Sequence, residues 1–254
     1  MPPEVQSRAP SRPRTPAQLV RRARRLVGNG VAWWLDYLFV GYWMARDVFG
    51  RADPEAFLKN PGPKAPVVMI PGVYERWQFL RPVGDHLARN GHPVHVVPAL
   101  RWNTASVADS AQLVLDLLAE RDLRRVIIVA HSKGGLIGKQ AMLRDADSRI
   151  DRMVAISTPF SGSVYARFLV GATLRAFSPN NAALKSLGAQ LEVNSRITSI
   201  WGTFDPHIPG GSELSGATNI TLKASGHFLP LGTRELRDAV DAALDGPAGS
   251  GSTT

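Results

Sequence analysis

The chain has 254 residues, a length that allows one domain with a full hydrophobic core. It contains no cysteine, which excludes disulfides, thiolate metal sites and cysteine nucleophiles. The formal net charge is +9, and residues 1–30 account for +6 of it through seven arginines and one glutamate. A basic arm on a nearly balanced body favours an anionic surface as partner, either lipid headgroups or nucleic acid, although such arms also serve only to solubilise a protein.

The N-terminal segment, residues 1–50, differs in composition from the rest of the chain. Residues 1–18 are rich in Pro, Arg and Ser and are predicted to be disordered. Residues 31–45 are apolar or aromatic apart from Asp36 and Gly41. This stretch is too short and too interrupted for a membrane span, which needs about 20 apolar residues. We expect an aromatic, amphipathic helix here.

Two placements of this helix are open. Trp and Tyr side chains prefer the membrane–water interface, so the helix could lie on an anionic leaflet through residues 19–50. Alternatively, residues 31–48 pack over the domain as an extra helix. The aromatic residues form one block and do not alternate with basic residues, so we expect no nucleic-acid partner. Because no cleavable signal peptide is evident, we expect a cytoplasmic protein. If the helix lies on an anionic leaflet, we expect the protein to be peripheral on the inner membrane face.

From residue 66 onward, short apolar runs alternate with amphipathic stretches. The apolar runs predict six strands, at 67–70, 94–97, 126–130, 153–156, 197–201 and 220–222. The amphipathic stretches predict helices at 77–90, after a Ser106–Asp109 capping box, from Lys133, around 182–191 and at 234–244. This alternation is typical of a parallel sheet covered on both faces. We therefore expect an α/β domain over 51–245 and a flexible tail over 246–254.

One strand-to-helix junction has the residues of a nucleophile. The predicted strand 126–130 runs directly into Ala130-His131-Ser132-Lys133-Gly134. This is the Gly-x-Ser-x-Gly pattern with alanine in the first position, and its serine occupies a strained turn that only small neighbours permit. The following helix directs its N-terminal dipole at charge that develops near the serine. The sequence predicts that Ser132 is a nucleophile, and an ordinary serine in a βα turn is the alternative.

A serine nucleophile needs a base, and the base needs a group that orients it. Asp205 follows the fifth predicted strand and His227 follows the sixth, which places both at carboxyl ends of strands, where open α/β sheets form their sites. The chain order Ser, Asp, His is the one that accompanies this serine turn. His207 is the rival base and Glu192 the fallback acid, while the His131 side chain is expected to point away from the site.

An oxyanion hole requires two backbone N–H donors near the serine. Lys133, directly after the nucleophile, is predicted to supply one of them. The turn after the first strand, Gly72-Val73, is predicted to supply the other, with Val73 as the preferred donor. No cluster of metal ligands and no nucleotide-binding loop is evident in the sequence, so we expect neither a metal nor a cofactor.

With these motifs, the chain resembles small bacterial lipases and esterases of the α/β-hydrolase superfamily, roughly from residue 66 to residue 244. The matching segments are 70–73, 130–135, 157–163, 202–205 and 226–227, in the expected order. Pro71 and Phe160 stand where relatives commonly have His, which bears on substrate choice. The resemblance implies an α/β-hydrolase fold with a minimal, mostly parallel six-stranded sheet, helices on both faces and an N-terminal helical extension.

The function expected from these residues is hydrolysis of carboxylic esters through a Ser132–His227–Asp205 triad and an acyl-enzyme. Similar lipases form lids and acyl pockets in the region that corresponds to residues 164–196, and the apolar side chains there suit a substrate with an apolar acyl chain. Closing the core is the alternative role for this region. An acyltransferase of the same fold and a non-catalytic membrane-surface module are the alternative functions.

Overall fold

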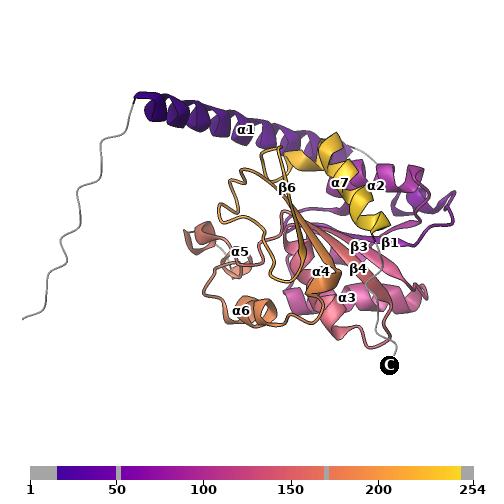
Figure 1. Cartoon of the computed structure of the whole chain (residues 1–254). Coiled ribbons are helices and arrows are strands. Elements are labelled where there is room, and N and C mark those ends of the chain that lie inside the picture. Colours follow the sequence, from indigo (N-terminus) through magenta and orange to yellow (C-terminus); the bar gives the residue numbers. More distant parts are fainter. Residues whose placement is uncertain (1–15, 50–52, 169–171, 247–254) are drawn as a thin grey trace, which may run out of the picture.

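The computed structural model describes residues 16–49, 53–168 and 172–246 (Figure 1). All six predicted strands are present: β1 (Val67–Ile70), β2 (Val94–Val96), β3 (Val126–His131), β4 (Ile150–Ile156), β5 (Ile197–Gly202) and β6 (Thr218–Leu222). They form one sheet in the order β2-β1-β3-β4-β5-β6, and every neighbouring pair is parallel. The chain order changes direction beside β1, and open sheets of this kind form their sites at such a point, at the carboxyl ends of the strands.

The sheet has a hydrophobic core on each face. Successive side chains of a strand point to opposite faces. In β1, Val68 and Ile70 therefore pack into one core, whereas Val67 and Met69 pack into the other. This arrangement explains why the central strands β1 and β3 appear in the sequence as apolar runs.

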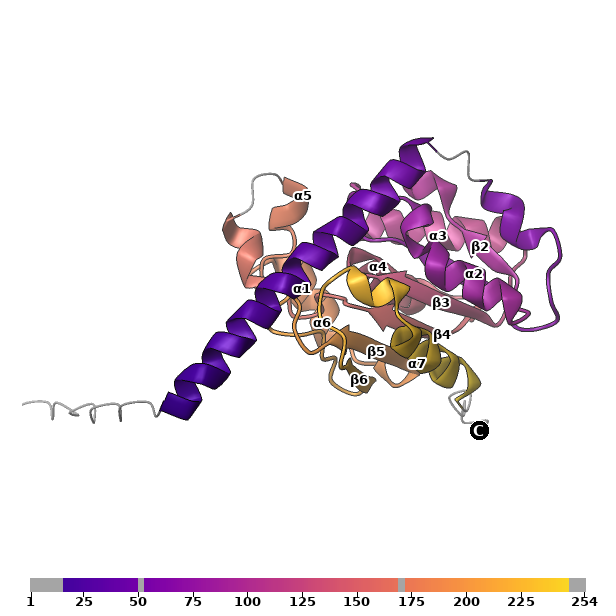
Figure 2. The ribbon, with the colours of Figure 1, turned by 90° about the horizontal axis from the view of Figure 1, so that it is seen from above.

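Helices cover both faces of the sheet, and α1 crosses outside them. One face is covered by α3 (Val107–Glu120), α4 (Lys133–Arg144) and α6 (Ala182–Ala189), and the other by α2 (Arg81–Arg89) and α7 (Arg234–Asp245). A short helix, α5 (Ala172–Arg175), precedes α6. Figure 2 shows α1 (Pro16–Phe49) as one long helix that runs across the α2 and α7 side of the domain, with its first turns projecting beyond the body.

Two predicted helix starts have different outcomes. The capping box is confirmed, since the Ser106 hydroxyl accepts the N–H of Asp109 at 3.1 Å at the start of α3. The predicted helix 77–90 is wrong at its start, because Trp77–Leu80 forms a 3₁₀ turn and α2 begins only at Arg81. Proline lacks an N–H and is tolerated in the first turn of a helix, so Pro82 favours this later start.

The N-terminal extension is helical, as predicted, but it begins earlier than expected. Residues 16–18, predicted to be disordered, form the first turn of α1. Pro16 is suited to this position because proline is favoured where a helix starts. Residues 1–15 and the tail 247–254 lie outside the described residues. Within the part of the chain that is described, no helix has the length and apolar character needed to cross a membrane.

Candidate active site

Ser132 lies in a sharp turn between β3 and α4. Its backbone has φ 51° and ψ −121°, a conformation that residues other than glycine rarely adopt. The N–H of Ser132 donates to the carbonyl of Ile156 on β4 at 2.8 Å, which holds the turn. Gly134 is required beside it, because a Cβ there would clash with the carbonyl oxygen of Ile70. The small residue of the motif therefore lets α4 approach β1 closely.

Three predicted residues from separate loops form a continuous chain of hydrogen bonds. Ser132 Oγ lies 3.0 Å from His227 Nε2, and His227 Nδ1 lies 2.7 Å from Asp205 Oδ2. All three side chains are buried. Asp205 Oδ1 also accepts the N–H groups of His207 and Ile208, at 2.7 and 3.0 Å, which fixes the carboxylate. Because the carboxylate accepts from Nδ1, the Nε2 atom of His227 is free to accept the hydroxyl hydrogen of Ser132.

The charges around His227 favour its role as a base. Burial alone would lower the pKa of His227, but the charge and hydrogen bond of Asp205, together with the charges of Glu75 and Asp36, outweigh burial, so this pKa is raised above its ordinary value. Burial would raise the pKa of Asp205, but His227 and the two backbone donors outweigh it, so this pKa is lowered. An ionised Asp205 therefore stands beside a histidine of increased basicity, as proton transfer from Ser132 requires.

A buried pair behind these residues holds the His227 backbone, and no motif of the sequence predicts it. His131 Nδ1 lies 2.9 Å from Glu75 Oε1, and His131 Nε2 lies 3.0 Å from the carbonyl oxygen of His227. The two ring nitrogens of His131 therefore face two oxygen atoms, one of a carboxylate and one of a backbone carbonyl. The expectation that His131 points away from the site is wrong in this respect, because its ring bonds the backbone of the histidine that contacts Ser132.

The two predicted oxyanion donors belong to the segments that directly follow β3 and β1. Lys133 is the first residue of α4, so its N–H has no acceptor within the helix. Val73 lines the same pocket as Ser132. The N–H of Gly72 is already donated to Glu75 Oε2 at 2.8 Å, so of the two residues of this turn Val73 remains the candidate donor.

The side chain of Lys133 has a separate, structural position. Its buried Nζ donates to the carbonyl oxygens of Asn103 and Ala105, at 2.7 and 2.5 Å. Burial lowers the pKa of Lys133 to about 8. Asn103 in turn donates from Nδ2 to the carbonyl of Pro71 at 2.7 Å. These bonds connect the serine turn to the turn that carries Val73.

A mainly apolar cavity of about 290 Å³ reaches Ser132 and His227. Its apolar and aromatic walls come from α1, from the turn after β1, from the region after β4 and from the loops that carry Asp205 and His227. They include Trp33, Tyr37, Val73, Pro159, Tyr165, Ala166, Leu174, Phe177, Ile208 and Phe228. The region 164–196 thus contributes to the cavity through Tyr165 and Leu174, and it also closes the core through Leu184 and Leu187.

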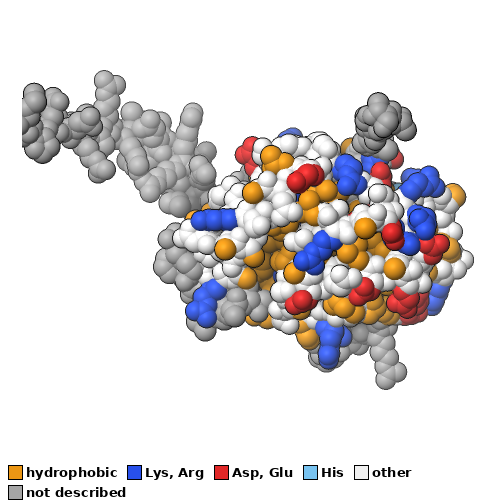
Figure 3. Space-filling view, turned by 90° about the horizontal axis from the view of Figure 1, so that it is seen from below, with side chains coloured by type: hydrophobic (Ala, Val, Ile, Leu, Met, Phe, Trp, Pro, Cys, Tyr) orange, Lys and Arg blue, Asp and Glu red, His pale blue; other side chains and the backbone are white. Residues whose placement is uncertain are grey.

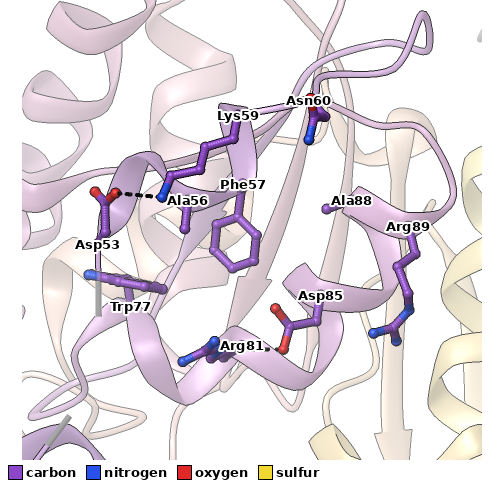
Figure 4. Close-up of a pocket in the computed structure, with 10 residues that line it drawn as sticks. All are labelled: Asp53, Ala56, Phe57, Lys59, Asn60, Trp77, Arg81, Asp85, Ala88 and Arg89. Carbon is purple, nitrogen blue, oxygen red and sulfur yellow. Dashed lines mark ion pairs between the residues drawn. The ribbon is translucent and has the colours of Figure 1, made fainter. Parts of the chain in front are cut away.

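A larger pocket of about 530 Å³ lies away from the serine, between the segment 53–60 and α2 (Figure 4). Four of its five charged side chains pair with one another, Lys59 with Asp53 at 3.8 Å and Arg81 with Asp85 at 3.4 Å. None of the residues that line it is a serine or a histidine. Its size therefore does not make it a site for nucleophilic chemistry.

The rival residues make other contacts. His207 Nε2 lies 3.2 Å from the Tyr37 hydroxyl oxygen, and its ring stacks against that of His227 with centroids 4.7 Å apart. Burial, with the nearby His227, lowers the pKa of His207 to about 4. Glu192 is exposed, and its carboxylate interacts electrostatically with Lys139.

Asp205, His207 and His227 offer ligand atoms that all lie within 4.8 Å of one another, a spacing at which three side chains can hold a metal ion. Asp205 and His227 bond each other directly, and His227 bonds Ser132 as well. A metal ion would have to replace both of these hydrogen bonds. The arrangement therefore suits proton transfer better than metal ligation.

The N-terminal helix forms part of the site. Asp36 and Trp43 of α1 are buried against the domain, and Trp33 and Tyr37 line the cavity. The packed placement of residues 31–48 is therefore realised. Several other residues of α1 are nevertheless exposed, among them Trp34, Leu38 and Tyr42.

No family model matches the chain, and no curated protein sequence matches it. Among solved structures, the mature form of the Bacillus licheniformis lipase BlEst2 is 16% identical with a TM-score of 0.57, over 73% of this chain and 94% of that chain. An extracellular α/β-hydrolase from a Paenibacillus species is 19% identical with a TM-score of 0.50, over 74% and 100%. An α/β-hydrolase fold protein from Burkholderia ambifaria is 18% identical with a TM-score of 0.51, over 73% and 91%. The chain therefore has the α/β-hydrolase fold, as the resemblance implies.

Proposed function

We propose that the protein is a serine hydrolase that cleaves carboxylic esters with apolar acyl chains. The observation that carries this proposal is the chain of hydrogen bonds from Asp205 through His227 to Ser132, at 2.7 and 3.0 Å. A nucleophile, a base and an acid that orients the base are the three groups that acyl transfer needs.

The geometry supports a two-stage reaction. Ser132 Oγ attacks the ester carbonyl carbon while His227 Nε2 takes the hydroxyl proton, and the N–H groups of Val73 and Lys133 donate to the oxyanion. His227 then gives the proton to the departing alcohol, which leaves the acyl group on Ser132. In the second stage His227 takes a proton from water, the hydroxide attacks the acyl carbon, and the returned proton restores Ser132 as the carboxylic acid departs.

The walls of the cavity support an apolar acyl group as the part of the substrate that is bound there. Aromatic and aliphatic side chains surround the serine, and the one acidic residue of the lining, Glu75, is bonded to His131. Each methylene removed from water contributes about 0.8 kcal/mol. In a series of p-nitrophenyl esters, kcat/KM should therefore rise about fourfold per added methylene until the cavity is filled.

A fluorophosphonate should label the folded protein at one residue per chain, because only an activated serine attacks phosphorus rapidly. Mass spectrometry of the digested protein should place the label on Ser132. Heat-unfolded protein is the control and should take up no label. Labelling of another residue, or the same labelling after unfolding, would contradict the proposed function.

We also propose that the exposed face of α1 binds an anionic membrane surface. Its large side chains in water include Trp33, Trp34, Leu38 and Tyr42, with Trp34 65% exposed. These residue types prefer the membrane–water interface, and four arginines precede them in the helix sequence, at positions 21, 22, 24 and 25. On the face opposite α1, charged side chains of both signs are interspersed with apolar ones (Figure 3).

Sedimentation with vesicles tests this surface. The protein should bind vesicles that contain phosphatidylglycerol and not vesicles of phosphatidylcholine alone, and added salt should weaken the binding. Trp34→Ala should weaken it about tenfold, since burying a large apolar side chain contributes about 1.5–3 kcal/mol. Trp102→Ala is the matched control, because Trp102 is 44% exposed on another part of the domain. An equal effect of both substitutions would exclude α1 as the specific contact.

A further inference from the structure

Asp36 is a buried carboxylate on a helix whose neighbouring side chains are largely exposed. Its side chain is 0% exposed, whereas Leu35 and Tyr37 on either side are 45% and 43% exposed. Trp43, two turns later on the same face of α1, is also buried. The buried face of α1 therefore carries a charge into the domain. Such a group is costly to bury unless hydrogen bonds satisfy it.

The partners of Asp36 are the backbone of the loop that carries His227. Asp36 Oδ2 accepts the N–H of His227 at 2.9 Å, and Asp36 Oδ1 accepts the N–H groups of Phe228 and Leu229, both at 2.7 Å. These residues begin the 3₁₀ turn Leu229–Gly232, so their N–H groups point outward from its N-terminal end. Asp36 caps this turn from a helix about 190 residues away in the sequence, with short, charge-assisted hydrogen bonds.

The loop is shaped to admit this carboxylate. Gly226, directly before His227, has φ 117°, a conformation that favours glycine. A Cβ at this position would lie 2.5 Å from Asp36 Oδ1. Two residues from distant parts of the chain are thus matched to each other, the acid on α1 and the glycine that makes room for it.

The backbone of His227 is held at both its polar groups. Its N–H is bonded to Asp36 from α1, and its carbonyl oxygen is bonded to His131 from β3. Asp205 holds the ring from a third direction. A displacement of about 1 Å between reacting groups can lower a rate about 100-fold, so the fixed backbone bears directly on the 3.0 Å contact with Ser132.

We propose that Asp36 is a positioning residue for His227, the base of the reaction. The N-terminal helix α1 then contributes to catalysis by holding His227 in place. The inference rests on the proposed ester hydrolysis through Ser132 and His227. It differs from a role of Asp36 in anchoring α1 alone, because anchoring would affect stability and leave turnover by the folded protein unchanged.

The direct test is Asp36→Asn in the full-length protein. Asparagine keeps the shape of the side chain but replaces one acceptor oxygen with an NH₂ donor, which faces a backbone N–H. We expect kcat, counted per fluorophosphonate-titrated site, to fall about 10- to 100-fold with little change in KM. Glu235→Gln is the matched control. Glu235 on α7 also accepts two backbone N–H groups of the same connection, at Lys223 and Ala224, away from His227.

The pH profile separates positioning from anchoring. Ester hydrolysis requires neutral His227, so kcat/KM falls as the pH falls through the pKa of that residue, which lies above its ordinary value of 6.5. Loss of the Asp36 charge lowers this pKa, so the acid limb of the profile should move to lower pH in Asp36→Asn and stay in place in Glu235→Gln. The other titratable groups that face His227 are Asp205, Glu75, His131 and His207.

Wild-type turnover and an unmoved acid limb in Asp36→Asn would overturn the proposal, as would an equal loss in Glu235→Gln. If Asp36→Asn does not fold, Asp36→Glu decides, because it keeps the charge. It should retain the acid limb of the wild type and lose less than tenfold in kcat, and a shifted limb would contradict the proposal. Absence of fluorophosphonate labelling in the wild-type protein would instead refute the proposed hydrolase function.

Discussion

Ser132→Ala should lower kcat for p-nitrophenyl ester hydrolysis by about six orders of magnitude. Without Oγ no acyl-enzyme can form, so the first stage of the proposed reaction is lost. The measurement is the release of p-nitrophenol in protein whose folding is checked by thermal melting. Ser212→Ala is the matched control, since Ser212 is also buried but lies outside the cavity. Activity within tenfold of the wild type in Ser132→Ala would refute the nucleophile.

The loss of kcat in Ser132→Ala should not become larger when His227 is replaced as well. Groups that act as one unit give non-additive losses, because a base without its nucleophile has no proton to take. His227→Ala alone and the double variant with Ser132→Ala should therefore match Ser132→Ala within a few-fold. A double variant that is much slower than both single variants would indicate that the two residues act independently.

Asp205→Asn is the second large effect, a fall of about 10⁴ in kcat with little loss of stability. Its amide oxygen can still accept the N–H groups of His207 and Ile208, so the loop should keep its shape. The NH₂ group, however, faces His227 Nδ1 and favours the tautomer that places hydrogen on Nε2. That hydrogen would block acceptance of the Ser132 proton.

A second acid–histidine pair supplies the control for Asp205→Asn. Asp241 Oδ2 lies 2.8 Å from His86 Nε2 on the surface formed by α2 and α7, far from Ser132 in the fold. Asp241→Asn should leave kcat within a few-fold of the wild type. His207→Gln tests the rival base, and a loss as large as that of Asp205→Asn would transfer the role of base from His227 to His207.

The parts of the structure that follow from local pattern were predictable. The central strands β1 and β3 are apolar on both sides because a core lies on each face of the sheet, so their runs are visible in the sequence. Ser132, Asp205 and His227 each follow a strand, and a parallel sheet brings the carboxyl ends of its strands to one edge. The structure brings these three residues together for that reason.

The supporting contacts were not predictable in the same way. Glu75 and His131 are 56 residues apart, and the bond from His131 to His227 joins a side chain to a backbone oxygen 96 residues away. No periodicity or residue spacing in a sequence predicts a contact of this kind. Asp36 did leave a signal, as the one acid within an aromatic stretch. In the sequence, that acid indicates only that the stretch is interrupted as a membrane span. The structure shows instead that its carboxylate is buried and accepts three backbone N–H groups.

The bond between Asp36 and the His227 loop also affects the order in which the protein is assembled. The two partners are 191 residues apart, so this contact closes a long loop of the chain. During synthesis α1 emerges well before the backbone groups that satisfy Asp36. A chain that lacks either α1 or the His227 loop could not form this bond, so ester hydrolysis by the proposed mechanism would begin only when these two segments have met.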